Sequence, residues 1–193
     1  MVDKNVKSAA PSTEILSRAS FSTRAPSFNK SLSLNSASDE SVNQDNTNNE
    51  AQQAADKQAL TIANKMLAED YYSQHLGIDI VEAKVGYSVC KMLVQRFHSN
   101  GHGSCHGGAI FSLADTTFAH ICNAHNQIAV GHICTIAYWR PANIGDELYA
   151  YAYESGVHGR SGSYRIEITC GENGELVAEF QGFSRSLKGQ NHF

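Results

Sequence analysis

The chain has 193 residues, enough for one ordinary domain with additional sequence. With 41% hydrophobic and 18% charged residues it can build a core, which excludes a wholly disordered protein. A formal net charge of -4 disfavours a nucleic-acid binder that neutralises phosphates, and no run approaches the ~18 apolar residues of a membrane span, so we expect neither nucleic acid nor membrane as a partner.

Residues 1–56 are dominated by Ser, Asn, Gln and Thr. Such a segment buries too little apolar surface to offset its ordering entropy, so we predict a disordered tail. Within it, residues 15–38 lack acidic side chains and carry Arg18, Arg24 and Lys30, a composition typical of an organelle transit peptide. The alternative is a solvated tail, because acidic residues precede this stretch.

The cysteines are odd in number and scattered, without a C-x-x-C pair: Cys90, Cys105, Cys122, Cys134 and Cys170. This pattern supports neither a disulfide framework nor a structural zinc site and indicates a reducing compartment. No secretory signal is visible at the start of the chain. We therefore expect a cytoplasmic protein, or one of an organelle matrix if the tail is a transit peptide.

A periodic pattern begins at Lys57, and we predict a folded domain over residues 57–187 followed by a short tail, 188–193. Ile62 and Met66 fall at helical spacing, and Gly77 is a candidate helix C-cap. Period-two alternation predicts strands, over residues 87–97, 133–139, 147–154, 164–170 and 176–180. Short turns make these strands antiparallel neighbours. With one apolar helix over 107–123, the pattern predicts an α+β fold, a long helix packed on an antiparallel sheet.

Asp115 lies in the middle of that helix and is the only side chain with a full charge between residues 97 and 139. Its helical neighbours are apolar: Phe111, Phe118, Ala119 and Cys122. An unpaired carboxylate on an apolar stripe costs several kcal/mol to bury, and proteins tolerate it mostly at working sites. The alternatives are that Ser or Thr hydroxyls or a distant Arg hold Asp115, or that it faces solvent.

A glycine-rich segment, residues 100–108, leads directly into the helix and contains four glycines. The first N–H groups of a helix are unpaired and carry the positive end of its dipole, so this entry is a candidate oxyanion site. The alternative is an ordinary flexible loop. Neither a dinucleotide-binding nor a phosphate-binding glycine motif fits. The spacing of His102, Cys105 and His106 fits no closed metal site, and Cys105 lacks a nearby base, so we expect no metal.

The run Asn100-Gly-His-x-x-Cys-His-Gly-Gly-x-x-Phe-Ser-Leu-Ala-Asp-Thr-x-Phe-Ala, followed by Cys134-Thr-Ile and Arg140-Pro, resembles the PaaI group of hotdog-fold acyl-CoA thioesterases, named for phenylacetate degradation. The resemblance covers residues 60–187. It implies a long central helix wrapped by an antiparallel sheet, and a homodimer in which two sheets become continuous, assembled further into a homotetramer. It also implies hydrolysis of an acyl-CoA, with aryl-acetyl or related acyl groups, without a metal or another cofactor.

The same resemblance implies roles for individual residues. Asp115 matches the catalytic carboxylate, and the Gly107 amide matches the group that polarises the thioester carbonyl. Asn100 and His106 match accessory polar positions of the catalytic site. Gly108 and Thr135 fall at substrate-contacting positions. The sequence departs from the group at Ala137, where relatives carry Asp, so the acyl group itself is not predicted more finely.

Two inferences concern the reaction geometry. Gly107 and Asp115 are eight positions apart, roughly 12 Å along one helix, so one carbonyl carbon cannot contact both groups of the same chain. If both act on it, Asp115 comes from a second subunit, which requires a two-fold dimer. CoA carries phosphates, and we predict that Arg160, in a basic turn, contacts them; the alternative is a solvated surface arginine.

Two other functions remain open. A non-catalytic acyl-CoA-binding protein has no need of a carboxylate beside the thioester, so Asp115 disfavours it. A hydroxyacyl-thioester dehydratase pairs a histidine with the carboxylate, and His106 leaves that chemistry open.

Overall fold

The computed structural model describes residues 38–193. Helix α1 (Ser38–Glu69) begins at Ser38, so the prediction that the tail is disordered to residue 56 is wrong for residues 38–56; the rest of that tail, with nearly all of the transit-peptide stretch, lies outside the described residues. The helix extends because Ala, Gln and Lys, abundant after residue 50, are strong helix formers. Gln52 also donates to Asp56 at 2.9 Å, a bond between neighbours one turn apart.

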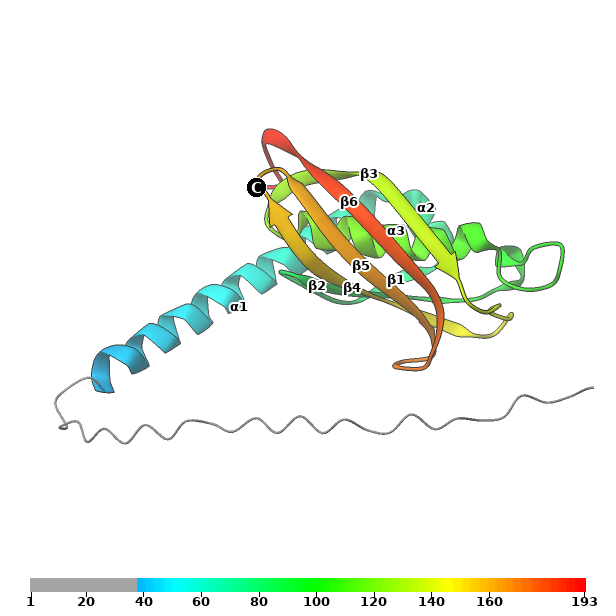
Figure 1. The fold of residues 1–193 in the computed structure, drawn as a ribbon, viewed down its shortest axis with the longest axis horizontal. Coiled ribbons are helices and arrows are strands. Elements are labelled where there is room, and N and C mark those ends of the chain that lie inside the picture. Colours follow the sequence, from blue (N-terminus) through cyan, green and yellow to red (C-terminus); the bar gives the residue numbers. More distant parts are fainter. Residues whose placement is uncertain (1–37) are drawn as a thin grey trace, which may run out of the picture. The chain divides into compact units, whose positions relative to one another are not determined.

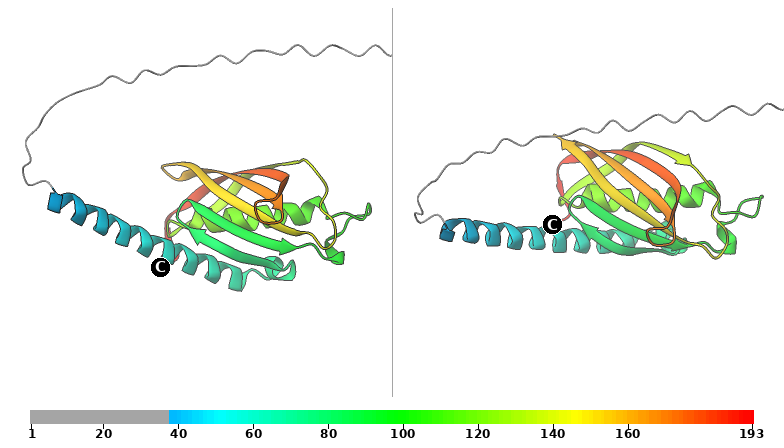
Figure 2. Two further views of the ribbon diagram at one scale, coloured as in Figure 1. Left: turned by 90° about the horizontal axis from the view of Figure 1, so that it is seen from below. Right: turned by 60° about the horizontal axis from the view of Figure 1, so that its bottom comes forward.

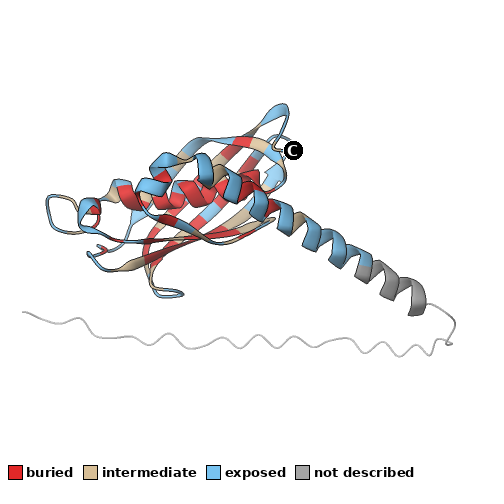
Figure 3. Cartoon of the chain, turned by 180° about the vertical axis from the view of Figure 1, so that it is seen from behind, coloured by how far each residue is buried: buried red, intermediate tan, exposed pale blue. Residues whose placement is uncertain are grey.

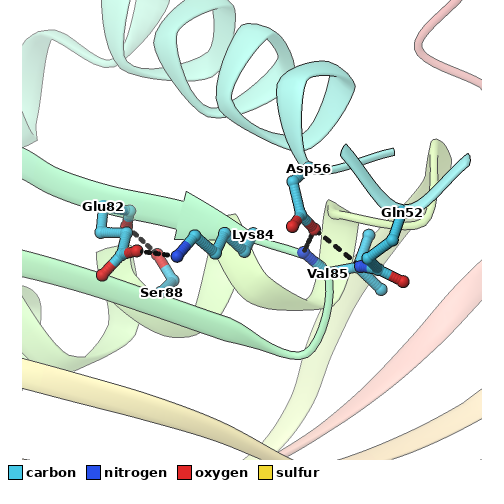
Figure 4. Close-up of polar contacts among 6 residues, drawn as sticks. All are labelled: Gln52, Asp56, Glu82, Lys84, Val85 and Ser88. Atoms are coloured by element: carbon cyan, nitrogen blue, oxygen red, sulfur yellow. Dashed lines mark hydrogen bonds and ion pairs between the residues drawn. The ribbon is translucent and has the colours of Figure 1, made fainter. Parts of the chain in front are cut away.

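Asp56 fixes α1 to the sheet. Its Oδ1 accepts the Val85 N–H at 3.1 Å as well as the Gln52 amide at 2.9 Å, and Val85 lies in the turn between the first two strands (Figure 4). Beyond this anchor, α1 buries Ala59, Ile62 and Ala63 against the body of the protein. The earlier part of the helix projects away from that body (Figures 1 and 2).

The sheet has six antiparallel strands in the order β1-β2-β4-β5-β6-β3, which makes β1 and β3 its edges. The strands are β1 (Ile78–Lys84), β2 (Tyr87–Leu93), β3 (Gln127–Tyr138), β4 (Glu147–His158), β5 (Ser161–Cys170) and β6 (Glu175–Asn191). The sheet curves around α3 (Gly107–Asn123), as Figures 1 and 2 show. The expected α+β fold, one long helix wrapped by an antiparallel sheet, is confirmed, and α3 has the predicted bounds.

Several element boundaries differ from the sequence-based predictions. Strand β1 was not predicted, and the strand expected over residues 87–97 ends at Leu93, before a short 3-10 helix, Arg96–His98. Strand β3 begins at Gln127, six residues before the expected start. Strand β6 runs to Asn191, which pairs with Gln127, so the expectation of a C-terminal tail over 188–193 is wrong for residues 188–191. The start of β3 and the end of β6 pair with each other, and this pairing extends both strands beyond the residues that alternate in the sequence.

A short helix, α2 (Tyr71–His75), connects α1 to β1. Gly77 follows its C-cap with a φ of 66°, a left-handed conformation in keeping with the predicted helix end. Among the described residues, no helix is long and apolar enough to cross a membrane. All five cysteines are free.

The core lies between α3 and the sheet (Figure 3). Leu113, Phe118 and Ile121 of α3 are fully buried there. Ile166 of β5 and Phe180 of β6 meet them from the sheet. This packing fixes the axial position of α3, so that the helix start and Asp115 are held rigidly on the scaffold.

Candidate active site

His106 caps the start of α3. Its Nδ1 accepts the Gly108 N–H at 2.8 Å, and a Cβ at position 108 would lie 2.9 Å from that nitrogen, so the cap requires glycine there. The Gly107 N–H, in contrast, has no hydrogen-bond partner within residues 38–193. Gly107, the predicted polarising group, therefore presents a free donor at the positive end of the helix. Gly108, predicted to contact substrate, has its N–H engaged by the cap.

Asn100 organises the loop before the helix. Its Oδ1 accepts the N–H groups of His102 at 2.8 Å and Ser104 at 3.3 Å. Its Nδ2 donates to the Ser104 hydroxyl at 3.1 Å and the Cys105 carbonyl at 3.4 Å. All of these contacts lie within the loop, so Asn100 acts here by holding the backbone that leads to Gly107.

Tyr138, at the end of β3, covers the helix start. Its hydroxyl donates to the Gly107 carbonyl at 2.8 Å, and its ring would lie 3.2 Å from a Cβ placed on Gly107. A side chain at position 107 would therefore press against this ring. Sequence reasoning missed Tyr138 as a site residue, because no local pattern relates it to a helix that begins 31 positions earlier.

Asp115 lies farther along α3, at the wall of a cavity of about 530 Å³. The Cys134 thiol donates to its Oδ1 at 3.9 Å, and no described cation forms an ion pair with it. Desolvation raises the pKa of the Asp115 carboxyl above its usual value. The Cys134 bond opposes this with a smaller effect, and the charge of Asp70 adds the smallest contribution, an increase. Asp115 is thus an acid without an ion-pair partner among the described residues, at the wall of a cavity. In the single chain this residue is exposed, so one of the alternatives read from the sequence, that Asp115 faces solvent, holds within one chain.

The cavity around Asp115 is mostly apolar. Its other lining residues are Met66, Phe111, Phe118, Ala119, Cys122, Asn123, Ala129, Val130, Gly131, His132 and Cys134. Sequence reasoning missed Met66 and His132 as site residues. His132 precedes the strand predicted from alternation, which begins at residue 133, and Met66 comes from a helix with no recognisable site motif.

Gly107, His106 and Asn100 do not line this cavity, so a single chain does not bring them into contact with the space around Asp115. His106, whose imidazole caps the helix, is therefore not paired with Asp115 within one chain. The pairing of His106 with the carboxylate that the dehydratase alternative needs is therefore not made within one chain, where His132 is the histidine that lines the Asp115 cavity.

Arg160 lies in the turn between β4 and β5 and lines a second cavity, of about 180 Å³. Cys122 and Ala129 line both this cavity and the Asp115 cavity, so the two adjoin. Arg160 is exposed and forms no ion pair with another described residue. Its guanidinium is therefore available to an anion near the Asp115 cavity.

Thr135 is an exposed residue of β3 and lines a separate hollow with Arg165 and Glu179. Side chains alternate between the faces of a strand, and its neighbour Cys134 packs toward the core on the Asp115 side. Thr135 is thus not joined to Asp115 within one chain. Among residues 38–193, no group of three His, Cys, Asp or Glu side chains could hold a metal ion.

A family model described as "Thioesterase superfamily" matches residues 102–177, which include α3, Asp115 and β3. Among curated proteins, the chain is 42% identical over 127 residues to acyl-coenzyme A thioesterase PaaI of Escherichia coli K12, a match that covers 66% of this chain and 90% of that protein. It is 28% identical over 104 residues to human acyl-coenzyme A thioesterase 13, with 53% of this chain and 74% of that protein covered.

Solved structures are similar over the same region. The E. coli PaaI protein from the phenylacetic acid degradation operon matches with a TM-score of 0.68 at 40% identity, over 70% of this chain and 98% of that one. A mutant of the phenylacetic acid degradation protein PaaI from Thermus thermophilus matches with a TM-score of 0.58 at 33% identity, over 61% of this chain and all of that one, 100%.

Proposed function

Because the chain belongs to the thioesterase superfamily, with its hotdog fold, and is an acyl-CoA thioester hydrolase, we propose that Asp115 is its catalytic carboxylate and that the Gly107 N–H polarises the thioester carbonyl. The observation that carries this proposal is the unpaired Asp115 carboxylate in an apolar cavity. The free Gly107 amide at the start of the same helix supports it.

The Gly107 amide acts on the charge that develops during the reaction. As a thioester carbonyl is attacked, its oxygen becomes negative, and an N–H donor at the positive end of a helix stabilises that charge. His106 and Asn100 serve as positioning residues, since one caps the helix and the other holds the loop before it. The donor is therefore fixed before substrate arrives, and little reorganisation is needed in the transition state.

Asp115 supplies the nucleophile by one of two routes. Either its carboxylate attacks the carbonyl carbon and expels the CoA thiolate, leaving a mixed anhydride that water hydrolyses, or it removes a proton from a water that attacks directly. Desolvation, which raises the Asp115 pKa, makes the carboxylate a stronger base in either route. Label that enters the Asp115 carboxylate during a single turnover in ¹⁸O-labelled water identifies the anhydride route, because that label arises only when water attacks the Asp115 carbonyl of the anhydride.

The reaction requires a second subunit. Gly107 and Asp115 are separated by roughly 12 Å along α3, and the cavity at Asp115 is not lined by Gly107. We propose a homodimer in which Asp115 of one subunit faces Gly107 of the other, with a homotetramer as a further assembly. Edge strand β3, which exposes Val130 and Ile133, is available for such an interface.

For the substrate, we propose an aryl-acetyl or related acyl group held against Phe111 and Phe118, with the CoA phosphates near Arg160. Aromatic walls suit an aromatic acyl group, and the relatives named for phenylacetic acid degradation point the same way. The shared lining of the two cavities by Cys122 and Ala129 supports this arrangement, with Arg160 beside the proposed acyl site. A cytoplasmic location stays a prediction from the scattered cysteines.

The test is the Asp115→Asn variant, which keeps the shape of the side chain and removes its charge. We expect kcat for a panel of aryl-acetyl, benzoyl and fatty acyl-CoAs to fall by on the order of 10²-fold or more, with the fold and assembly retained. A thiol reporter measures released CoA. Hydrolysis near the wild-type rate by a correctly folded variant contradicts the assignment of Asp115.

A further inference from the structure

We propose that Met66 is a specificity-determining residue, which limits the length of the acyl group in the Asp115 cavity, and that His192 is a positioning residue that holds this wall in place. The proposal rests on the assignment of that cavity to the acyl group. It concerns two residues that lie outside the stretch matched by the family model, 102–177.

Met66 reaches the cavity because α1 is firmly packed at the preceding turn. Ile62, one turn earlier on the same face, is 0% exposed, and Ala63 beside it is 1% exposed. Met66 is half-buried and lines the cavity together with Phe111 and Asp115 of α3. Among the described side chains of α1, Met66 alone lines the cavity, so it is the contact between this part of the helix and whatever occupies the cavity.

The C-terminal segment fixes the same end of the cavity. Asn123, a buried lining residue, donates from Nδ2 to the carbonyls of Ala119 at 2.9 Å and Ala129 at 3.0 Å. Its Oδ1 is therefore an acceptor, and it lies 2.7 Å from His192 Nε2, which must donate to it. His192 thus connects the end of the chain directly to a cavity residue.

Lys65, the immediate neighbour of Met66, joins α1 to the C-terminal segment. Its ammonium donates to the His192 carbonyl at 3.4 Å and lies 5.0 Å from the centre of the Phe193 ring. The Phe193 N–H in turn donates to Asn126 Oδ1 at 3.2 Å. Helix α1 beside Met66, the C-terminal segment and the residues that follow α3 are therefore linked, so the backbone that carries the methionine is held at the edge of the cavity.

A methionine in this position limits the length of the acyl group that fits the cavity, and a substitution at position 66 should change that length. Its unbranched thioether fills irregular space, so truncation opens room along the cavity, and a bulkier ring removes room. One methylene that fits or fails to fit an apolar pocket changes kcat/KM by roughly 10–200-fold. The change should appear in the ratio between long and short acyl groups rather than in the overall rate.

The experiment compares Met66→Ala and Met66→Phe with wild type on butanoyl-, hexanoyl-, octanoyl- and decanoyl-CoA. We expect the ratio of kcat/KM for decanoyl-CoA over butanoyl-CoA to rise on the order of tenfold in the alanine variant and to fall on the order of tenfold in the phenylalanine variant. Leu60→Ala is the matched control, because Leu60 lies on the same helix, is 42% exposed and does not line the cavity.

His192 is tested by two variants. His192→Ala should move the decanoyl-to-butanoyl ratio in the same direction as Met66→Ala, by a smaller factor. His192→Gln should restore the wild-type ratio, because its amide can still donate to Asn123 Oδ1. A merely structural role would lower all rates together and leave the ratio unchanged.

The same series is also measured as dissociation constants in the Asp115→Asn background. This readout separates the two proposals, because a Met66 effect on chain-length preference is visible in binding whether or not Asp115 is catalytic. A chain-length preference that is identical in wild type, Met66→Ala and Met66→Phe, in variants that melt like wild type, overturns the inference.

Discussion

The charged form of Asp115, which we propose is needed for catalysis, lowers the stability of the folded chain. Desolvation by the apolar cavity raises its pKa above the usual value of 3.8, which means that the folded chain binds this proton more tightly than the unfolded chain. The contribution of Asp115 to stability is therefore most favourable at low pH, where the group is protonated in both states. It becomes unfavourable as the pH rises through 3.8 and past the raised pKa.

This sign gives a prediction for stability. At about pH 7, Asp115→Asn should raise the Tm, because it removes a desolvated charge, and the difference from wild type should shrink toward zero near about pH 3. Thermal melts across this range measure it. A variant that is less stable than wild type at neutral pH would indicate that the carboxylate has a stabilising partner.

Arg160 gives a second prediction at this scale. If its guanidinium binds CoA phosphates, Arg160→Ala should raise KM for an acyl-CoA by roughly tenfold and leave kcat/KM unchanged for the corresponding acyl-pantetheine, which lacks the nucleotide. Arg96→Ala, another exposed arginine, serves as the control. Equal losses on both substrates would assign Arg160 a structural role.

At the scale of elements, the position of α3 depends on two glycines that flank Phe118. A Cβ on Gly131 of β3, or on Gly182 of β6, would lie 2.8 Å from the Phe118 ring. The absence of these side chains lets β3 and β6 approach the helix closely. Because Phe118 also lines the Asp115 cavity, this close approach shapes the site.

Gly182→Ala should therefore destabilise the fold by about 1–3 kcal/mol, as expected for overpacking in a core. Urea unfolding measures the loss, and Gly101→Ala is the control, because nothing lies within 4 Å of a Cβ at Gly101. Adding Phe118→Leu to Gly182→Ala should recover part of the stability. A Gly182→Ala variant as stable as wild type would show that the ring moves freely.

At the scale of the whole molecule, the proposed site depends on two chains. Gly107→Pro removes the N–H at the first helical position, where the backbone tolerates proline, and His106 already has the extended φ of -65° and ψ of 133° that a residue before proline prefers. Because any Cβ at position 107 would lie 3.2 Å from the Tyr138 ring, Gly107→Ala, which keeps the N–H, is the matched control. Asp115→Asn removes the carboxylate. Each homodimer should be inactive for a different reason.

Co-expression of the two inactive chains should restore activity. In a mixed dimer, one site combines Asp115 of the first chain with Gly107 of the second, so a random mixture should reach about a quarter of the wild-type rate. Tagged mixed dimers, purified away from both homodimers, should reach about half of the wild-type rate, because one of their two sites is intact. If both groups came from the same chain, the mixture would stay inactive.

The sequence determined α3 and the identity of its carboxylate. Apolar residues at helical spacing, glycines at the entry and the isolated charge of Asp115 are local features, and the helix has the bounds that they predict. Strands β4 and β5 were likewise predicted from the period-two alternation of side chains within each segment. The local sequence is sufficient to predict a helix or strand when that element buries one face, because its periodicity then shows in the residues themselves.

The tertiary structure alone decided which distant residues share the site. Met66, His132 and Tyr138 come from elements whose own patterns carry no sign of a site. The face that Thr135 occupies follows from the register of β3 on β6, and the extent of both strands follows from their mutual pairing. These features arise from contacts between segments far apart in the chain, which hydrophobic periodicity along a single segment does not encode.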